Sequence, residues 1–399
     1  IVSDLADGPR PSGRRVAQRV TFMNRRFWRV GLAILSAVLV LATTGYYLWP
    51  RTHLENSTID GVSVGSALGG DANAGYQRAY QPRPFVFPAD HGPHPAFRNE
   101  WWYVTGNLAD ATGREFGYQL TLFRIALAPT APAADSAWRT NQVYMGHFAL
   151  TDAADDTHRA FERFSRGAIG LAGAQAAPLR VWLEDWELAS TGPEPFPLRV
   201  RAHQDDIAVD LLLDTAKPLV LQGEQGLSQK SAEPGNASYY YSLTRLPTRG
   251  TISLNGQIFT VSGASWLDRE WSTSALGPEQ SGWDWFALQL DDGRDVMFYR
   301  LRRKDGSVDS FSKGMLVAVD GSARVLRWNE VDLQPLGAWT SPRTGDRYPA
   351  GWRLRVPTEK LDLTVTPKIA DQEMRLTVRY WEGAVAVGGH AGDQAVAGQ

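Results

Sequence analysis

The sequence predicts an all-β protein made of two related antiparallel domains, and three observations lead to this fold class. The 399-residue chain has 15 Trp, 13 Tyr and 15 Phe beside 38 Gly and 23 Pro, a composition that favours strands and tight turns over helices. Short runs of alternating aromatic and β-branched residues recur with turn signals between them. One hairpin pattern occurs twice along the chain.

The strand-like runs begin at Trp101 and end at Trp381. They cover residues 101–108, 116–124, 143–150, 181–188, 207–213, 239–245, 251–261, 283–290, 295–303, 314–319, 352–356, 361–366 and 374–381. Turns such as Asn255-Gly256 separate neighbouring runs, because Gly takes the positive φ that tight hairpin loops require. Hairpins at this spacing are typical of sandwiches and up-and-down barrels.

The repeated hairpin divides the chain into two domains. Residues 101–118 and 283–298 share an aromatic strand, a turn, and a Gly-Arg-acid start to the next strand. A repeat about 180 residues apart indicates two related domains, since solenoid units are far shorter. We therefore expect a first domain over 81–249, a second over 250–388, and a flexible tail over 389–399.

The N-terminal segment predicts export from the cytoplasm. Three arginines over 25–29 precede an uncharged run over 30–50, which as a helix would reach about 31 Å, roughly one bilayer core. The basic flank predicts that the chain beyond this run lies on the periplasmic side, with the inner membrane as a partner. The run is either a retained signal anchor or a cleaved signal peptide. Residues 1–29 are then a cytoplasmic tail or upstream sequence, and residues 51–80 a Ser- and Gly-rich linker.

Composition and spacing exclude several classes of protein. The formal charge of -2 offers no basic surface for a phosphate backbone, so we expect no nucleic-acid partner. The absence of cysteine removes disulfides, thiol catalysis and Cys-based zinc sites. His91 and His94 lie in a Pro- and Gly-rich loop without the helical spacing of metal ligands, so we predict a polar turn and no metal.

The segment 263–271 concentrates acidic groups that could perform chemistry. In a strand, Trp266, Asp268 and Glu270 share one face, because side chains alternate between the two faces of a sheet. If that face points into an apolar space, desolvation and mutual repulsion would keep one carboxyl protonated and able to donate a proton to an alkene or enol ether. The alternative is that these carboxylates form salt bridges with Arg269 or Arg245.

Other polar residues are expected to stabilise the fold. Glu100, at the start of a strand beside three aromatics, predicts a buried acid paired with Arg98 or Arg245. We predict that His147 is a structural histidine of the core and not a catalytic base. The predicted structural network comprises His91, His94, Glu100, His147 and Arg245.

Several blocks of sequence together resemble one known family. The blocks are Pro88-Ala89-Asp90-His91-Gly92-Pro93-His94-Pro95, Glu100-Trp101-Trp102-Tyr103-Val104-Thr105-Gly106-Asn107-Leu108, Gly146-His147-Phe148-Ala149-Leu150-Thr151-Asp152, Trp266-Leu267-Asp268-Arg269-Glu270-Trp271 and Trp381-Glu382-Gly383-Ala384-Val385. In this order they resemble the lipocalin-like family of AttH and the carotenoid 1,2-hydratases, often labelled predicted secreted hydrolases. The resemblance covers about 85–388. It implies two tandem lipocalin-like antiparallel β-barrels after the N-terminal transmembrane or signal helix, an apolar cavity, and no cofactor.

The resemblance also suggests site residues. The acid aspartate of the hydratases maps onto Asp268, whereas a His and a Trp of the hydratases fall at Tyr239 and Tyr241, and a phenol cannot replace an imidazole base near pH 7. The expected catalytic residues are Asp268, Glu270 and Tyr241. The expected substrate-binding residues are Trp266, Tyr239, Trp101, Tyr103, Trp283 and Trp285. Relatives continue into a last strand where this chain ends in an Ala- and Gly-rich stretch, so the second barrel is expected to lack its closing strand.

Three functions follow from these expectations. The leading one is an exported protein that encloses an isoprenoid, polyene or lipid-like ligand and acts as a cofactor-independent hydratase or isomerase, a lyase of the carotenoid 1,2-hydratase type. The alternative is a non-catalytic lipid carrier or accessory protein of an envelope export system, with ABC-type transporter components as partners. The third, hydrolysis, follows only from the family label, since no serine with a matching His and Asp stands out in the sequence.

Overall fold

The computed structural model describes residues 74–399 except 132, 134 and 275. The expected segments 1–29 and 30–50, and residues 51–73 of the expected linker, lie outside the described residues. Among the helices of the described part, none has the length and hydrophobicity that a bilayer crossing needs.

Strands dominate the described residues, which confirms the all-β fold class. The helical elements there are the short 3₁₀ helices η1 (Ala89–His91), η2 (Trp328–Glu330) and η3 (Pro357–Glu359). The first thirteen strands are β1 (Asn99–Asp110), β2 (Glu115–Ala126), β3 (Gln142–Asp152), β4 (Thr157–Arg166), β5 (Ala172–Ala176), β6 (Leu179–Leu183), β7 (Trp186–Ser190), β8 (Leu198–Gln204), β9 (Ile207–Leu213), β10 (Val220–Leu221), β11 (Leu227–Gln229), β12 (Ala237–Leu254) and β13 (Gln257–Ser272). The remaining strands are β14 (Gln280–Gln289), β15 (Asp295–Arg303), β16 (Lys313–Val317), β17 (Ala323–Arg327), β18 (Asp332–Pro335), β19 (Ala338–Thr340), β20 (Arg347–Pro349), β21 (Trp352–Val356), β22 (Leu361–Pro367), β23 (Glu373–Arg375), β24 (Arg379–Trp381), β25 (Val385–Ala391) and β26 (Gln394–Gly398).

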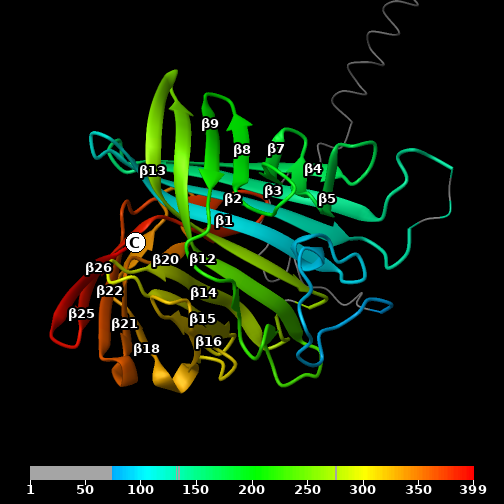
Figure 1. Ribbon diagram of the computed structural model, residues 1–399. Helices are drawn as coiled ribbons and strands as arrows, with labels where there is room; N and C mark the ends of the chain where they lie inside the picture. The colour runs from blue at the N-terminus through cyan, green and yellow to red at the C-terminus, as the bar shows by residue number, and fades with distance from the viewer. Residues whose placement is uncertain (1–73, 132, 134, 275) are drawn as a thin grey trace, which may run out of the picture. The chain divides into compact units, whose positions relative to one another are not determined.

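The strands β1 to β13 form one antiparallel sheet in the order β4-β3-β2-β1-β13-β12-β9-β8-β7-β6-β5, and β10 and β11 also pair with β12. The sheet is barrel-like and nearly closed, and its strands surround one apolar core (Figure 1). That core includes Trp102, Leu120, Phe148, Trp186, Val200, Leu211 and Trp271. Because large aliphatic and aromatic side chains occupy this interior, it is a packed core.

The division between the two halves differs from the expected boundary at 249/250. That position lies inside β12, which continues to Leu254 and returns through β13 into the first sheet. Gly250 has a φ of +156°, and a Cβ atom there would lie 2.1 Å from the carbonyl oxygen of Asp210 on β9. The glycine that suggested a domain boundary therefore permits a close approach between two paired strands. The sheets change between β13, which ends at Ser272, and β14, which begins at Gln280.

The strands β14 to β26 form the second part of the structure, drawn from gold to red in Figure 1. This part contains two larger sheets, with the strand orders β14-β15-β16-β17 and β18-β21-β22-β25-β26. Two further pairs of strands are β19-β20 and β23-β24. The repeated hairpin of the sequence corresponds to β1-β2 and β14-β15. A second apolar core includes Phe286, Leu288, Phe298, Leu354, Leu363 and Val387.

The C-terminal residues are ordered as strands, unlike the expected flexible tail over 389–399. β25 runs to Ala391 and β26 pairs with it in antiparallel register. The Gln289 amide donates to the Gln399 carbonyl at 2.8 Å, and the Gln399 amide donates to the Gln289 carbonyl at 3.0 Å. These bonds join the end of β26 to the end of β14, where we expected an unpaired edge.

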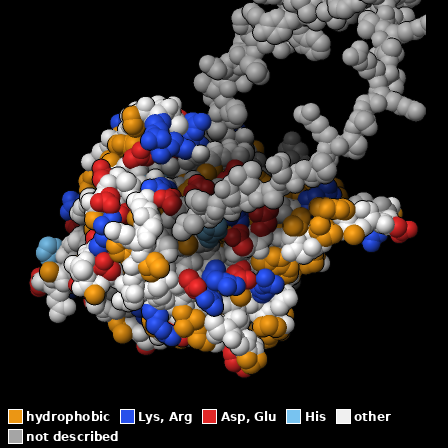
Figure 2. All heavy atoms as spheres, turned by 90° about the horizontal axis from the view of Figure 1, so that it is seen from above, with side chains coloured by type: hydrophobic (Ala, Val, Ile, Leu, Met, Phe, Trp, Pro, Cys, Tyr) orange, Lys and Arg blue, Asp and Glu red, His pale blue; other side chains and the backbone are white. Residues whose placement is uncertain are grey.

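Basic and acidic side chains alternate over the face of the molecule shown in Figure 2, without a large area of one sign. Many of the exposed charges are paired locally, as between Arg199 and Asp210 at 2.5 Å and Arg353 and Asp362 at 2.6 Å. Such exposed pairs contribute little to stability.

Candidate functional site

A cavity of about 420 Å³ lies between the two halves of the structure. One wall is the face of β1, β12 and β13 that points away from the first core, and the opposite wall is the β14-β15 hairpin. Of the residues predicted to bind substrate, Trp101, Tyr103, Trp283 and Trp285 line this cavity. Such a wall of aromatic rings is suited to an apolar ligand.

Asp268 on β13 faces the cavity and is held by three donors. Tyr240 Oη donates to Oδ2 at 2.7 Å, and Trp266 Nε1 donates to Oδ1 at 2.7 Å. Ser242 donates to Oδ1 as well. The side chain is 4% exposed, so it is almost removed from water.

Burial, with a smaller contribution from the nearby Glu270, raises the pKa of Asp268 to about 7 despite the lowering effect of the three donors. Burial outweighs the hydrogen bonds because a charged carboxylate loses more solvation energy in this apolar site than the donors return. Near neutral pH a large fraction of Asp268 is a neutral acid that can give up a proton.

Glu270 lies two residues further along β13 on the same face, as the alternation predicted. Ser238 donates to its carboxylate, and Lys230 Nζ lies 3.1 Å from Oε1. Lys230 also lies 4.4 Å from the centre of the Tyr299 ring. Glu270 is therefore paired with Lys230, and its charge contributes to the raised pKa of Asp268.

Tyr241 and Tyr239, predicted as catalytic and substrate-binding residues, point to the opposite face of the sheet. Tyr241 Oη lies 2.6 Å from His91 Nδ1, and Tyr239 Oη donates to the Gln81 carbonyl at 3.0 Å. Both belong to the core of the first sheet. The correction has a simple cause: Tyr240, between them, takes the cavity face because successive side chains of a strand alternate.

Glu382 is a further acid at the cavity, and sequence reasoning did not select it. It directly follows β24, and Tyr103 Oη donates to its Oε1 at 2.7 Å. Burial raises the pKa of Glu382 to about 7, while hydrogen bonds from Tyr103 and Tyr380 lower it. The only signal in the sequence was the block Trp381-Glu382-Gly383, which carried the family resemblance without an assigned role.

A separate polar network occupies the opposite face of the first sheet. Glu100 is fully buried and pairs with Arg124 and Arg269, not with Arg98 or Arg245. These two guanidinium groups hold the pKa of Glu100 well below its usual range despite its burial. His94 lies in the same network and stacks on Trp271 with ring centres 3.8 Å apart.

The other predicted network residues have structural partners too. His91 ends η1, and burial lowers its pKa to about 4. Arg245 binds Asp295 at 2.6 Å, so neither it nor Arg269 pairs with Asp268. His147 lies on β3, between Tyr380 and a carboxylate on β4. Within the described ranges, no group of three or more His, Asp and Glu side chains is placed to hold a metal ion.

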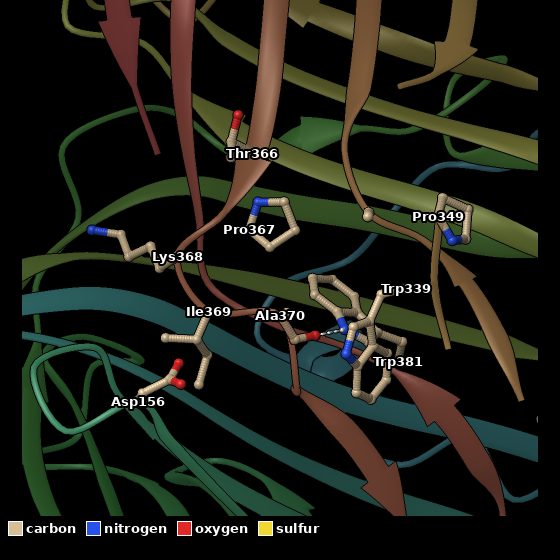
Figure 3. Close-up of a pocket in the computed structure, with 10 residues that line it drawn as sticks. Asp156, Trp339, Pro349, Thr366, Pro367, Lys368, Ile369, Ala370 and Trp381 are labelled. Carbon is tan, nitrogen blue, oxygen red and sulfur yellow. Dashed lines mark hydrogen bonds between the residues drawn. The ribbon is translucent and has the colours of Figure 1, made fainter. Parts of the chain in front are cut away.

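A smaller pocket of about 280 Å³ adjoins the cavity. Figure 3 shows its wall, which includes Trp339, Pro349, Pro367 and Trp381. Pro349, Pro367 and Trp381 also line the larger cavity. The Trp381 indole donates to the Ala370 carbonyl at 3.0 Å, which fixes the ring at the wall that the two spaces share.

Comparison with known proteins adds a family and a fold. The AttH-like family model matches residues 78–399. The crystal structure of a protein assigned as AttH from Nitrosomonas europaea is 33% identical, with a TM-score of 0.70, and the match covers 81% of this chain and 97% of that chain. Kievitone hydratase from Nectria haematococca has a TM-score of 0.60 at 15% identity, over 81% of this chain and 94% of that one, which is a likeness of fold. No curated protein sequence matches this chain.

Proposed function

Because the chain belongs to the AttH-like family, whose fold is lipocalin-like, we propose that it encloses an apolar, alkene-containing ligand and acts as a cofactor-independent hydratase or isomerase. The observation that carries this proposal is Asp268, a neutral acid near pH 7 that faces a cavity lined with aromatic rings. One structure of the same fold is named a hydratase, and the proposal extends that reaction class to this chain.

The proposed reaction begins with proton transfer from Asp268 to one carbon of a double bond. The π electrons form the new C–H bond, and the other carbon becomes a carbocation while Asp268 becomes a carboxylate. The faces of Trp101, Trp283 and Trp285 stabilise this cation, since aromatic rings attract positive charge. This carbocation has two alternative fates. Addition of water with loss of a proton gives an alcohol, whereas loss of a proton from a neighbouring carbon gives an isomeric alkene.

The ligand is proposed to be an extended isoprenoid, polyene or lipid-like molecule. A volume of about 420 Å³ falls in the usual range for small-molecule sites. The smaller pocket lies beside the cavity and shares Pro349, Pro367 and Trp381 with it as a common wall. Side chains fill the interior of the first sheet, which favours the space between the two halves as the binding site.

The two halves are proposed to be tandem lipocalin-like barrels, the first formed by β1 to β13 and the second by β14 to β26. The bonds between Gln289 and Gln399 support closure of the second one. We further propose that the protein is exported to the periplasmic side and held at the inner membrane by residues 30–50. A non-catalytic lipid carrier, working with ABC-type transporter components, remains the second candidate function, because the same cavity suits storage.

The test compares Asp268→Asn with the wild-type protein on acyclic isoprenoid alcohols of increasing length, namely geraniol, farnesol and geranylgeraniol. The matched control is Asp206→Asn, the same change at an exposed salt bridge. The proposal expects binding by both variants, and loss of water addition or isomerisation at least 100-fold in Asp268→Asn alone. Turnover that persists in Asp268→Asn contradicts the acid role, and tight binding without turnover in any form identifies a carrier.

A further inference from the structure

We propose that Glu382 is the second proton-exchanging group of the cavity and that Tyr380 and His147 connect it to Glu162 at the protein surface. This inference rests on the proposed function and deepens it: Asp268 supplies a proton to the ligand, and Glu382 removes one from the attacking water.

The connection runs through neighbouring side chains. Tyr380 on β24 lies two positions before Glu382, lines the same cavity and lowers the pKa of the Glu382 carboxyl group. The Tyr380 hydroxyl lies 2.8 Å from His147 Nδ1 on β3. His147 Nε2 lies 3.1 Å from Glu162 Oε1 on β4. The hydroxyl of Thr377 donates to the other oxygen of Glu162 at 2.6 Å. Both ring nitrogens of the histidine are therefore engaged, one toward the cavity and one toward the surface.

The two ends of this series have different surroundings. The His147 side chain is 1% exposed, whereas that of Glu162 is 13% exposed, so a proton reaches solvent at Glu162. At the other end Glu382 lines the cavity and accepts a hydrogen bond from Tyr103. His147, between these ends, is buried, so the part of the path that it forms is closed to solvent.

Both acids face the same part of the cavity. Tyr103, the hydrogen-bond partner of Glu382, lies opposite Asp268 in the β1-β13 register. The ionisable groups that act on Glu382 are Tyr103 from β1 and Tyr380 from β24. Farther along, Asp268 acts on Tyr103, and Glu162 on Tyr380. No guanidinium or ammonium group acts on Glu382 among the described residues, so no salt bridge fixes it as a permanent carboxylate.

The arrangement supplies the base that hydration needs. After Asp268 protonates the alkene, the oxygen of a water molecule bonds to the carbocation, and one of its O–H bonds breaks as the proton moves to the Glu382 carboxylate. Glu382 then gives this proton to Tyr380 while the Tyr380 hydroxyl proton moves to His147. The imidazole releases the proton from its other nitrogen to Glu162 and solvent. Water that enters as the product leaves returns a proton to Asp268, so alkene and water are consumed and an alcohol is formed.

The first test follows the protonation of Glu382 without any ligand. Infrared spectra of the full chain are recorded between pH 5 and pH 9. The carbonyl band of protonated Glu382 is the one that is present in wild type and absent in Glu382→Gln. The band of protonated Asp268 is assigned in the same way with Asp268→Asn. After a rapid pH jump we expect the Glu382 band to relax at least tenfold more slowly in Tyr380→Phe and in His147→Gln. Tyr76→Phe, which removes another half-buried phenol hydroxyl, is the control and is expected to relax like wild type.

The second test uses turnover and separates the two proposals. Glu382→Gln is expected to lower water addition about 100-fold and to leave farnesol binding unchanged, a typical effect of losing a general base. Relaxation in Tyr380→Phe at the wild-type rate overturns the connection. Full water addition by Glu382→Gln, with Asp268→Asn inactive, overturns the role of Glu382 and leaves the proposed function standing. Full turnover by Asp268→Asn overturns the proposed function instead. The infrared measurement then still decides whether Tyr380 and His147 carry protons between Glu382 and Glu162.

Discussion

Tyr240 on β12 donates to Asp268 on β13 at 2.7 Å, whereas its neighbour Tyr241 contacts His91 at 2.6 Å on the other face of the same sheet. The sheet thus separates two polar systems. One faces the cavity and contains Asp268, whose pKa is raised, and the other contains Glu100, whose pKa two guanidinium groups lower. This separation explains why carboxyl groups on adjacent strands have pKa values shifted in opposite directions.

The hydrogen bond from Tyr240 controls the pH range of the proposed activity. It lowers the pKa of Asp268, so Tyr240→Phe is expected to raise that pKa further. Since the reaction needs protonated Asp268, the alkaline limb of the pH–rate profile should move to higher pH. Tyr241→Phe serves as the comparison and should leave the alkaline limb in place. A downward shift in Tyr240→Phe would contradict the assignment.

Asp268 is expected to destabilise the folded protein at neutral and alkaline pH. Its pKa rises from 3.8 in an unstructured chain to about 7 in the fold, so between these values the folded state holds a proton that the unfolded state lacks. Stability attributable to this group therefore falls as pH rises from about 4 to 7. The difference corresponds to at most roughly 4 kcal/mol. Urea denaturation should show Asp268→Asn gaining stability over wild type between pH 5 and pH 8, and a gap that is constant with pH would refute this.

Glu100 is expected to be essential for folding and not for binding. Glu100→Gln leaves Arg124 and Arg269 buried without their anion, which should cost about 3–5 kcal/mol in the free energy of unfolding. Chemical denaturation measures this loss. The folded fraction should bind farnesol with unchanged affinity, because Glu100 lies on the opposite face from the cavity. Unchanged stability of Glu100→Gln would contradict this prediction, because Arg124 and Arg269 would then not depend on Glu100 as their buried partner.

The aromatic wall is expected to supply much of the ligand affinity. Trp285→Ala removes a ring that lines the cavity and packs against Tyr103 at 5.3 Å between ring centres. Loss of this buried surface should weaken farnesol binding at least tenfold, as measured by calorimetry. The control is Trp182→Ala, because that indole binds the Gly170 carbonyl in an exposed position. Equal losses in both variants would place the ligand elsewhere.

The fold class and the pairing of residues along one strand could be predicted from the sequence. Aromatic and β-branched alternation indicated the strands, and the same alternation placed Trp266, Asp268 and Glu270 together, as the hydrogen bond between Trp266 and Asp268 shows. The repeated hairpin could also be predicted, because it depends on local residues and a turn.

Relations between strands could not be predicted in the same way. The β12-β13 register shifts between Leu243 and Leu246, and a shift by one residue exchanges the faces of a strand. Tyr241 was expected at the site because a residue of the hydratases maps onto it, but alternation along β12 places Tyr240 on the cavity face instead. Glu382 meets Tyr103 across 279 positions of sequence, a contact that no local pattern encodes. The place of the cavity, between the sheets, likewise depends on tertiary packing.

The most direct test of the central claim is the protonation state of Asp268 in the folded protein. Infrared difference spectra between wild type and Asp268→Asn, recorded from pH 4 to pH 9, isolate the carbonyl band of this side chain. A protonated band that persists at pH 6 and disappears with a midpoint near pH 7 is the predicted result. A midpoint near the ordinary value of 3.8 would contradict the claim, since the cavity would then hold a carboxylate with no proton to give.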